Sequence, residues 1–166
     1  MWNRNRTTLI PKPGKENSKI ENYRPITIGS TLCRLYWGIM DNRLRDRTSF
    51  SQRQKCFVYE SECFNNDHMF NEFLNSAKTN KGITIIQLDI TKAFDTITHA
   101  IIHPSLSRLG LPREIISICK SYEHVSTTIG HKESKVEILQ RGVKQRVPLS
   151  PFLFNAAMDP SSNWRI

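Results

Sequence analysis

The sequence has no long hydrophobic segment. No apolar run in its 166 residues approaches the roughly 20 residues that a membrane-spanning helix needs. The opening residues, MWNRNRTTLIPK, also lack the apolar stretch of a secretory signal peptide. We therefore expect an intracellular protein with no membrane partner, and the sequence does not distinguish nucleus from cytoplasm.

Cysteines are few, and none of them forms a CxxC pair. Such pairs are typical of structural zinc sites and of redox sites. The isolated cysteines are expected to be reduced and mostly packed thiols rather than zinc ligands or disulfides. They are Cys33, Cys56, Cys63 and Cys119.

Acidic residues are scarce in the first third of the chain. Residues 1–55 carry twelve Lys or Arg and four acids, so they hold +8 of the formal net charge of +9. A basic surface of this kind favours a polyanionic partner, most often nucleic acid. On charge alone, a solvated positive face that only keeps the protein soluble is an equal alternative.

Prolines limit the structure of the first thirty residues. Pro11, Pro13 and Pro25 exclude a helix there, so 7–12 and 24–28 are predicted as extended segments. Ser30 can cap the helix that follows. Its predicted apolar face comprises Leu32, Leu35, Tyr36, Ile39, Met40 and Leu44.

Helical and extended segments occur in separate clusters along the rest of the chain. Helices are predicted over about 66–78, 99–109 and 112–122, and from about 150. Residues 83–88 are predicted as a buried strand, and 125–129 and 135–139 as a hairpin. This pattern indicates one domain of the α+β class.

The segment QLDITKAFDTITH carries two carboxylates, Asp89 and Asp95, just after the predicted buried strand. An Asp at a strand end commonly caps the turn or helix that follows. Taken alone, the segment therefore favours a structural interpretation over a catalytic one.

Four segments together resemble a known family. LIPKPGK, ENYRPITI, QLDITKAFDTITH and RGVKQRVPLSPFLFN, in this order, are similar to the reverse transcriptases of non-LTR retrotransposons, in particular the site-specific elements that insert into ribosomal DNA. The resemblance covers about residues 7–158. It implies the fingers and a partial palm of a right-hand polymerase, with an incomplete antiparallel palm sheet. Residues 1–82 would be fingers-like, and residues 83–166 would form the partial palm.

The resemblance also implies a catalytic position at Asp89. Asp89 matches the family's first metal-binding aspartate, and the Ile90 carbonyl would be a second contact to Mg²⁺. Phe94 matches the aromatic residue beneath the incoming sugar, where a ring would clash with a 2′-hydroxyl and so favour deoxynucleotides. Core packing is the alternative for Phe94. Asp95 and His99 also fit the pattern, but we assign them structural roles, with Asp95 as a cap.

Basic residues match the positions that contact nucleotide and template in this family. Lys12, Lys15 and Arg24 correspond to contacts with the triphosphate, although an exposed loop charge is the alternative, and it is favoured more for Lys15 than for Arg24. Arg141 and Gly142 match the loop against the template base and the nucleotide. A second basic cluster would fit the template backbone, or simply a solvated helix end. Its members are Arg43, Arg45, Arg47, Arg53 and Lys55.

The chain departs from its family at two places. Arg146 and Val147 stand where relatives have Gly and Asp, and if the turn needs a positive φ, Arg146 costs roughly 1 kcal/mol or more. Val147 would also remove a capping carboxylate. In addition, the sequence contains no adjacent pair of aspartates, which the family's third palm motif supplies.

The resemblance therefore implies a fragment of an RNA-directed DNA polymerase. The parent reaction would add deoxynucleotides from their triphosphates to a DNA primer on an RNA template, with Mg²⁺. Because two of three carboxylates are missing, we expect this chain to be inactive alone. The alternatives are a non-catalytic RNA- or DNA-binding module and a degenerate product without selected function.

Overall fold

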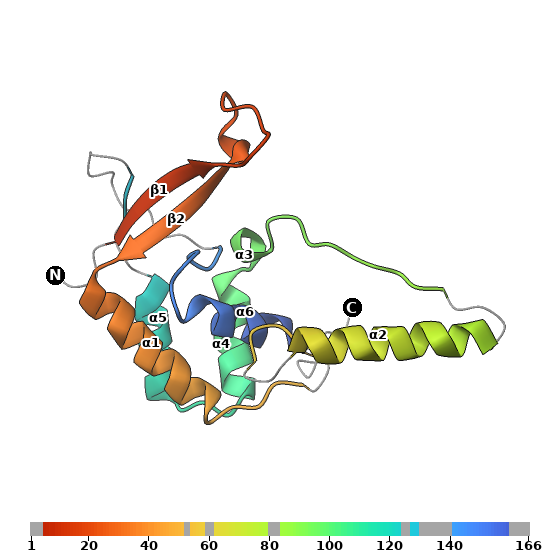
Figure 1. Cartoon of the computed structure of the whole chain (residues 1–166). Coiled ribbons are helices and arrows are strands. Elements are labelled where there is room, and N and C mark those ends of the chain that lie inside the picture. Colours follow the sequence, from red (N-terminus) through yellow and green to blue (C-terminus); the bar gives the residue numbers. More distant parts are fainter. Residues whose placement is uncertain are drawn as a thin grey trace.

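The computed structural model describes residues 5–51, 54–58, 62–79, 84–123, 127–129 and 141–159, and all structural statements below refer to them. A narrow β-hairpin rises from a body of packed helices, and one long helix projects away from that body (Figure 1). The elements in chain order are β1 (Asn5–Pro11), η1 (Ile20–Asn22), β2 (Tyr23–Gly29), α1 (Thr31–Arg45), α2 (Glu62–Thr79), α3 (Ala93–Thr96), α4 (His99–Arg108), α5 (Arg113–Glu123), β3 (Thr127–Ile129) and α6 (Ser150–Met158).

The two extended segments near the start form an antiparallel pair, as the prolines allow. β1 pairs with β2 from Asn5 opposite Gly29 to Pro11 opposite Tyr23. Pro11 is tolerated because it is the last residue of β1, and Pro25, opposite Leu9, is tolerated because β2 is an edge strand. β3 pairs in parallel with the start of β1, so the strand order is β2-β1-β3. The predicted strand 125–129 is thus confirmed in part, and 135–139 lies outside the described residues.

The predicted helices are all present. Ser30 caps α1, because its side chain accepts a hydrogen bond from the Cys33 N–H at 3.2 Å. α4 and α5 match their predicted ranges closely, α2 is longer than predicted, and α6 begins at Ser150 as predicted. None of the helices in the described part of the chain combines the length and the apolar character needed to cross a bilayer.

The buried face of α1 differs from the prediction. Its buried residues are Cys33, Trp37, Met40 and Leu44. Leu32 and Leu35, placed on the core face by the periodicity, are exposed, as is Ile39. The face of α1 that bears Trp37 is buried, and the Trp37 indole packs edge-to-face on Tyr122 of α5, with ring centroids 5.4 Å apart.

The core joins both halves of the chain. It combines α1 residues with Ile102 and Leu106 of α4, and with Phe152 and Leu153 of α6. Phe50, in the segment after α1, packs on Phe152 with centroids 5.4 Å apart. Residues before and after position 82 therefore share one core, and the proposed division there stays a prediction about function.

The predicted buried strand at 83–88 is wrong for the part that is described. Residues 84–90 are extended, but they pair with no strand among the described residues, and their side chains are exposed. β-branched composition favours an extended backbone, but burial requires neighbouring strands, and the small sheet lies elsewhere. The segment runs from the side of α2 to α3 (Figure 1).

Substitutions in α1 test which of its faces holds the fold. Trp37 is 1% exposed and Leu35 is 60% exposed. We expect Trp37→Ala to lower the free energy of unfolding by about 3–5 kcal/mol, because it leaves a large cavity. Leu35→Ala, the matched control on the same helix, should change it by less than about 0.5 kcal/mol.

Urea unfolding followed by circular dichroism measures both variants. A cooperative transition in the parent chain would argue against a degenerate product. Equal losses in the two variants would contradict the burial of the Trp37 face.

Candidate nucleotide and template site

Two segments far apart in sequence are joined by backbone hydrogen bonds. The Gly142 N–H donates to the Ile97 carbonyl at 2.7 Å, and the Val143 N–H donates to the Phe94 carbonyl at 2.8 Å. Thr98 and Arg141 form an antiparallel bridge at the same place. The segment after Asp89 and the glycine-containing loop, which resembled separate motifs, therefore form one unit.

Gly142 permits this close approach. Its φ is +90°, in the region that favours glycine. A Cβ atom there would lie 3.4 Å from the Cα and the carbonyl oxygen of Asp95, and 3.4 Å from the Phe94 oxygen. His99 adds a contact, with its Nε2 2.8 Å from the Gly142 carbonyl oxygen. This contact agrees with a structural role for His99.

Gln145 connects this unit to the hairpin. Its carbonyl accepts a hydrogen bond from the Thr27 N–H of β2 at 3.3 Å. Its side-chain amide donates to Asp95 Oδ1 at 3.4 Å. Asp95 does not cap a helix as predicted, since it lies inside the short helix α3, whose N-cap residue is Lys92. Gln145 thus brings β2, α3 and the loop together.

Tyr122 fixes the middle of the loop. Its buried hydroxyl accepts from the Lys144 N–H at 3.0 Å and hydrogen-bonds the Ser150 hydroxyl. The Ser150 hydroxyl in turn donates to the Lys144 carbonyl. The Lys144 ammonium donates to the Tyr122 carbonyl and lies 4.5 Å from the centre of its ring. The side chain of Lys144, in the centre of the loop, is therefore bound to α5.

Asp89 and Ile90 make no hydrogen bond with this unit among the described residues. Both are exposed in the extended segment 84–90. Within the described residues, no group of three His, Cys, Asp or Glu side chains could hold a metal ion. Asp89 with the Ile90 carbonyl supplies one carboxylate and one neutral oxygen, which falls short of what two hard divalent cations require. The residues described do not fit a complete metal site.

Phe94 is half-buried in a cluster of aromatic rings. Its centroid lies 4.8 Å from that of Phe154 on α6 and 6.1 Å from that of Phe57. This packing supports the alternative interpretation, in which Phe94 is a core residue. The predicted contact with a sugar is compatible with it, because the ring keeps a partly exposed surface.

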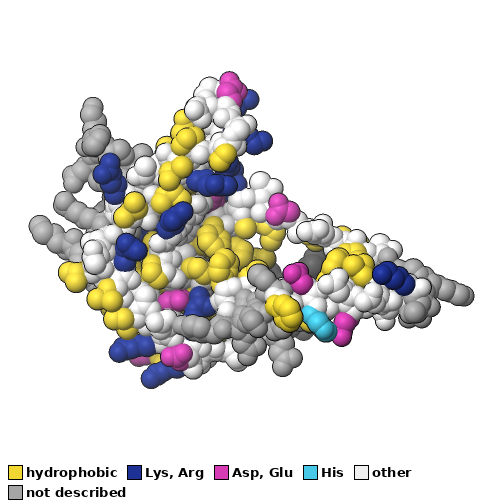
Figure 2. Space-filling view, viewed as in Figure 1, with side chains coloured by type: hydrophobic (Ala, Val, Ile, Leu, Met, Phe, Trp, Pro, Cys, Tyr) yellow, Lys and Arg dark blue, Asp and Glu magenta, His cyan; other side chains and the backbone are white. Residues whose placement is uncertain are grey.

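The hairpin carries the first predicted basic group. Arg24 is exposed on β2, and Lys15 is exposed in the turn. Lys12 is more constrained, because its ammonium donates to the Glu21 carbonyl at 2.9 Å. Lys and Arg side chains are spread over the hairpin and the adjacent body on the face shown in Figure 2. Arg141 is exposed where the loop begins.

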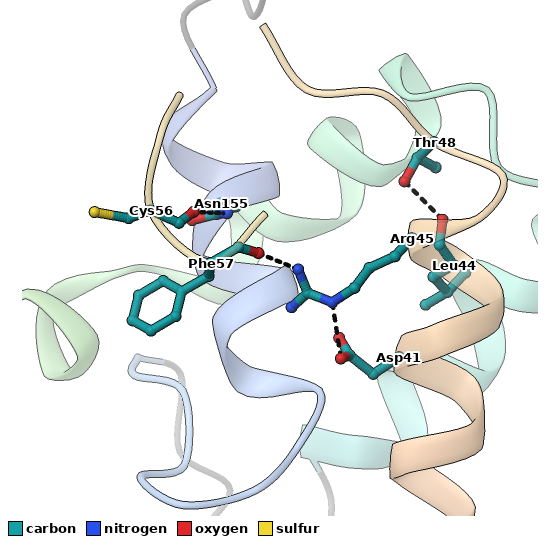
Figure 3. A network of polar contacts seen from close by, with 7 residues as sticks. All are labelled: Asp41, Leu44, Arg45, Thr48, Cys56, Phe57 and Asn155. Carbon is teal, nitrogen blue, oxygen red and sulfur yellow. Dashed lines mark hydrogen bonds and ion pairs between the residues drawn. The ribbon is translucent and has the colours of Figure 1, made fainter. Parts of the chain in front are cut away.

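Arg45, from the second predicted basic cluster, is structural. Its side chain is 11% exposed, and its Nε donates to Asp41 at 2.8 Å. Its guanidinium also donates to the Phe57 carbonyl and lies 5.9 Å from the centre of the Phe152 ring (Figure 3). Phosphate contact by Arg45 would break this network, so we remove it from the cluster.

The other members of that cluster are placed differently. Arg43 and Arg47 are exposed at the end of α1, and Lys55 is half-buried. Arg53 lies outside the described residues. The segment after α1 is tied to α6 by Asn155, which accepts from Gln54 at 2.7 Å. Asn155 also donates to the Cys56 carbonyl at 2.6 Å (Figure 3). Asp159 accepts from the Ser51 N–H at 2.9 Å.

Comparison with known proteins decides the family. Residues 10–165 match the family described as reverse transcriptase (RNA-dependent DNA polymerase). The chain belongs to the reverse transcriptase family. The match includes most of the C-terminal residues after 158, which the motifs alone had left out.

Several relatives of this reverse transcriptase domain come from R2 retrotransposable elements of insects. The chain is 39% identical to the retrovirus-related Pol polyprotein of a type-1 R2 element from Popillia japonica, over 95% of this chain and 23% of the relative. It is 35% identical to the polyprotein of the type-2 element R2DM from Drosophila melanogaster and 34% identical to an R2 polyprotein from Nasonia vitripennis, each over 93% of this chain and 15% of the relative. The chain thus spans less than a quarter of the length of these relatives.

Two contacts of the reverse transcriptase domain were not predicted from its sequence. Gln145 and Tyr122 position the loop, and both act through partners more than twenty residues away. Gln145 lies within one of the motifs that carry the family resemblance, but the sequence does not show which residues it contacts. Tyr122 gave no signal beyond an aromatic residue near the end of a predicted helix.

Arg146 stands where relatives of this domain have Gly, and the predicted backbone strain is present there. Arg146 has a φ of +71°, in the left-handed region where a side chain is strained. Val147 is buried, and the residue before α6 offers no side-chain cap. The loop keeps its shape despite the arginine because its neighbours Gln145 and Lys144 are held by the contacts above.

Replacing the strained residue should stabilise the domain. We expect Arg146→Gly to raise the free energy of unfolding by about 1 kcal/mol, because glycine adopts a positive φ without steric cost. Arg146→Ala is the control, since it removes the same side chain but keeps the Cβ atom, and it should gain little. Urea unfolding measures both. An equal gain in the two variants would assign the effect to charge rather than to the backbone.

Proposed function

We propose that this chain forms the fingers-like region and the front part of the palm of a retrotransposon RNA-directed DNA polymerase. The parent reaction is template-directed addition of deoxynucleotides to a primer 3′-end. The chain would bind part of the nucleotide and the template, and it would be inactive alone. Membership of the reverse transcriptase family and the similarity to R2 polyproteins support this proposal.

The observation that carries the proposal is the joining of three motifs. The hairpin, Phe94 and Asp95 of α3, and the loop 141–147 meet at Gln145, although the hairpin and the loop are more than a hundred residues apart and Asp95 and Gln145 are fifty apart. A polymerase needs its triphosphate-binding cations, its nucleotide-contacting turn and its template-contacting loop on adjacent surfaces. The described contacts join the backbones of these motifs, which supports the proposal.

The proposed roles follow from the positions of the side chains. Arg24 and Lys15 are exposed cations that can approach the triphosphate, where the arginine fork can bond two phosphate oxygens. Lys12 would contribute less, because Glu21 already accepts from it. Arg141 and Gly142 would lie against the template base and the nucleotide. Arg43, Arg47, Arg53 and Lys55 remain candidates for the template backbone.

The metal-binding role of Asp89 is also part of the proposal. Asp89 would contribute one carboxylate to the Mg²⁺ site, with the Ile90 carbonyl beside it. The described residues supply no further carboxylates at that point, and the sequence has no adjacent aspartate pair. The remaining ligands would have to come from another polypeptide segment, and we derive no catalytic step through the metal.

Primer extension tests the proposed inactivity. The purified chain is expected to extend an oligo(dT) primer on poly(rA) no further than an Asp89→Ala variant does, with or without Mg²⁺. The reason is that one carboxylate cannot hold two cations. Efficient synthesis that disappears in Asp89→Ala would contradict the inactivity and would assign catalysis to this chain.

A second candidate function is a non-catalytic module that binds RNA or DNA. The concentration of +8 of the net charge of +9 in residues 1–55 favours it. Such binding depends on cation release from phosphates, so it is sequence-independent and sensitive to salt.

Binding to a single-stranded RNA separates the roles of these cations. We expect an Arg24→Ala and Lys15→Ala double variant to bind more weakly and to lower the magnitude of the salt slope by about 1.4, since each phosphate contact on a single strand contributes about 0.7. Lys120→Ala, which removes an exposed cation of α5, is the control and should leave the affinity nearly unchanged. Fluorescence anisotropy at several salt concentrations measures this. Equal losses from the hairpin and from α5 would contradict a binding surface on the hairpin.

A further inference from the structure

Phe57, in the segment between α1 and α2, has a backbone conformation that bulky residues disfavour. Its φ is +58°, in the left-handed region. Two contacts hold the chain there. The Phe57 carbonyl accepts a hydrogen bond from the Arg45 guanidinium, and the preceding Cys56 carbonyl accepts one from the Asn155 side chain at 2.6 Å. A strained conformation of this kind persists only where the surrounding structure fixes it, and such residues cluster at functional sites.

Arg45, which binds the Phe57 carbonyl, has little freedom of its own. Its side chain is 11% exposed, and its Nε donates to Asp41 at 2.8 Å. In Figure 3 the carbonyl of Phe57 faces Arg45, and the ring of Phe57 points away from this network. The network therefore sets the direction in which the Phe57 ring projects.

Burial does not explain why the Phe57 ring is held in this way. Phe57 is 49% exposed, whereas Phe152, which lies under the same Arg45 guanidinium, is fully buried. A half-exposed ring offsets little of the cost of a strained backbone. The Phe57 ring instead contacts Phe94 of α3, with centroids 6.1 Å apart and planes tilted by 43°. The strained segment thus presents a partly exposed ring to Phe94.

Phe94 is held by its backbone and by two neighbouring rings. Its carbonyl accepts from the Val143 N–H at 2.8 Å, so the main chain is fixed. Its ring can then move only by rotation about the side-chain bonds. Phe154 of α6, 4.8 Å away between centroids, and Phe57 limit that rotation, because aromatic pairs prefer particular mutual orientations.

We propose that Phe57 is a positioning residue for Phe94, and that it keeps the Phe94 ring in the orientation that excludes a 2′-hydroxyl from the nucleotide site. This role rests on the proposed function, in which Phe94 lies beneath the sugar. A ring that tilts aside makes room for the hydroxyl, so discrimination requires that the tilt be opposed. One aromatic pair opposes it by the equivalent of roughly two- to tenfold in an equilibrium constant. A deoxyribose does not require the ring to move, so its binding does not depend on Phe57.

Titration of the whole chain with dATP and with ATP tests this role. A fluorinated phenylalanine at position 94, followed by fluorine NMR, reports binding even where the affinity is weak. We expect the parent to bind dATP more tightly than ATP. Phe57→Ala should raise the affinity for ATP roughly two- to tenfold and leave that for dATP unchanged. Phe57→Tyr keeps the ring and should keep the parent ratio of the two affinities.

The matched control is Phe73→Ala, which removes a ring that is 58% exposed on α2 and should change neither affinity. Circular dichroism should show the parent spectrum for every variant, because both phenylalanines are exposed. A parent ratio in Phe57→Ala, an equal loss of both nucleotides, or the same change in Phe73→Ala would overturn the positioning role alone. A parent chain that binds neither nucleotide, or binds both equally, would overturn the proposed nucleotide contact at Phe94 and the role of Phe57 with it.

Discussion

Two backbone hydrogen bonds, from Gly142 to Ile97 and from Val143 to Phe94, hold together the part of this reverse transcriptase domain that resembles a nucleotide and template site. They join segments more than forty residues apart, and each is a direct contact between main chains. Position 142 favours glycine because its φ is +90°, and a Cβ atom there would be in close contact with Asp95 and Phe94. The geometry of the loop, the turn and the hairpin follows from this junction.

The junction explains why the loop tolerates an unfavourable residue. Arg146 is held at a positive φ, which costs about 1 kcal/mol or more relative to glycine. Gln145 and Lys144, just before it, are fixed by Thr27, Asp95 and Tyr122, so the strained conformation has no easy alternative. The same contacts bind the side chains of Gln145 and Lys144 within the domain. Arg24 and Arg141, in contrast, remain exposed.

Local signals in the sequence predicted the local structure well. The Ser30 cap, the helical periodicities and the prolines of the hairpin each act over a few residues, and the structure agrees with them. The face of α1 was predicted correctly for Met40 and Leu44 and wrongly for Leu32, Leu35 and Ile39. Both sides of the helix are apolar, and the side with Trp37, which packs on Tyr122, is the buried one. The strand at 83–88 failed for a similar reason, since a β-branched segment is buried only where other strands meet it. Gln145 and Tyr122 depend on distant partners, which neither periodicity nor motif spacing reveals.

Hydrogen exchange at the amides of Gly142 and Val143 tests the junction most directly. Both amides donate to backbone carbonyls at short distance, so they should exchange as slowly as buried amides of α4 and α6. The amides of residues 84–90, which pair with no strand in the described part of the chain, should exchange quickly. If Gly142 and Val143 instead exchanged as fast as those residues, the loop would not be joined to the Phe94–Ile97 segment, and this account of the site would be wrong.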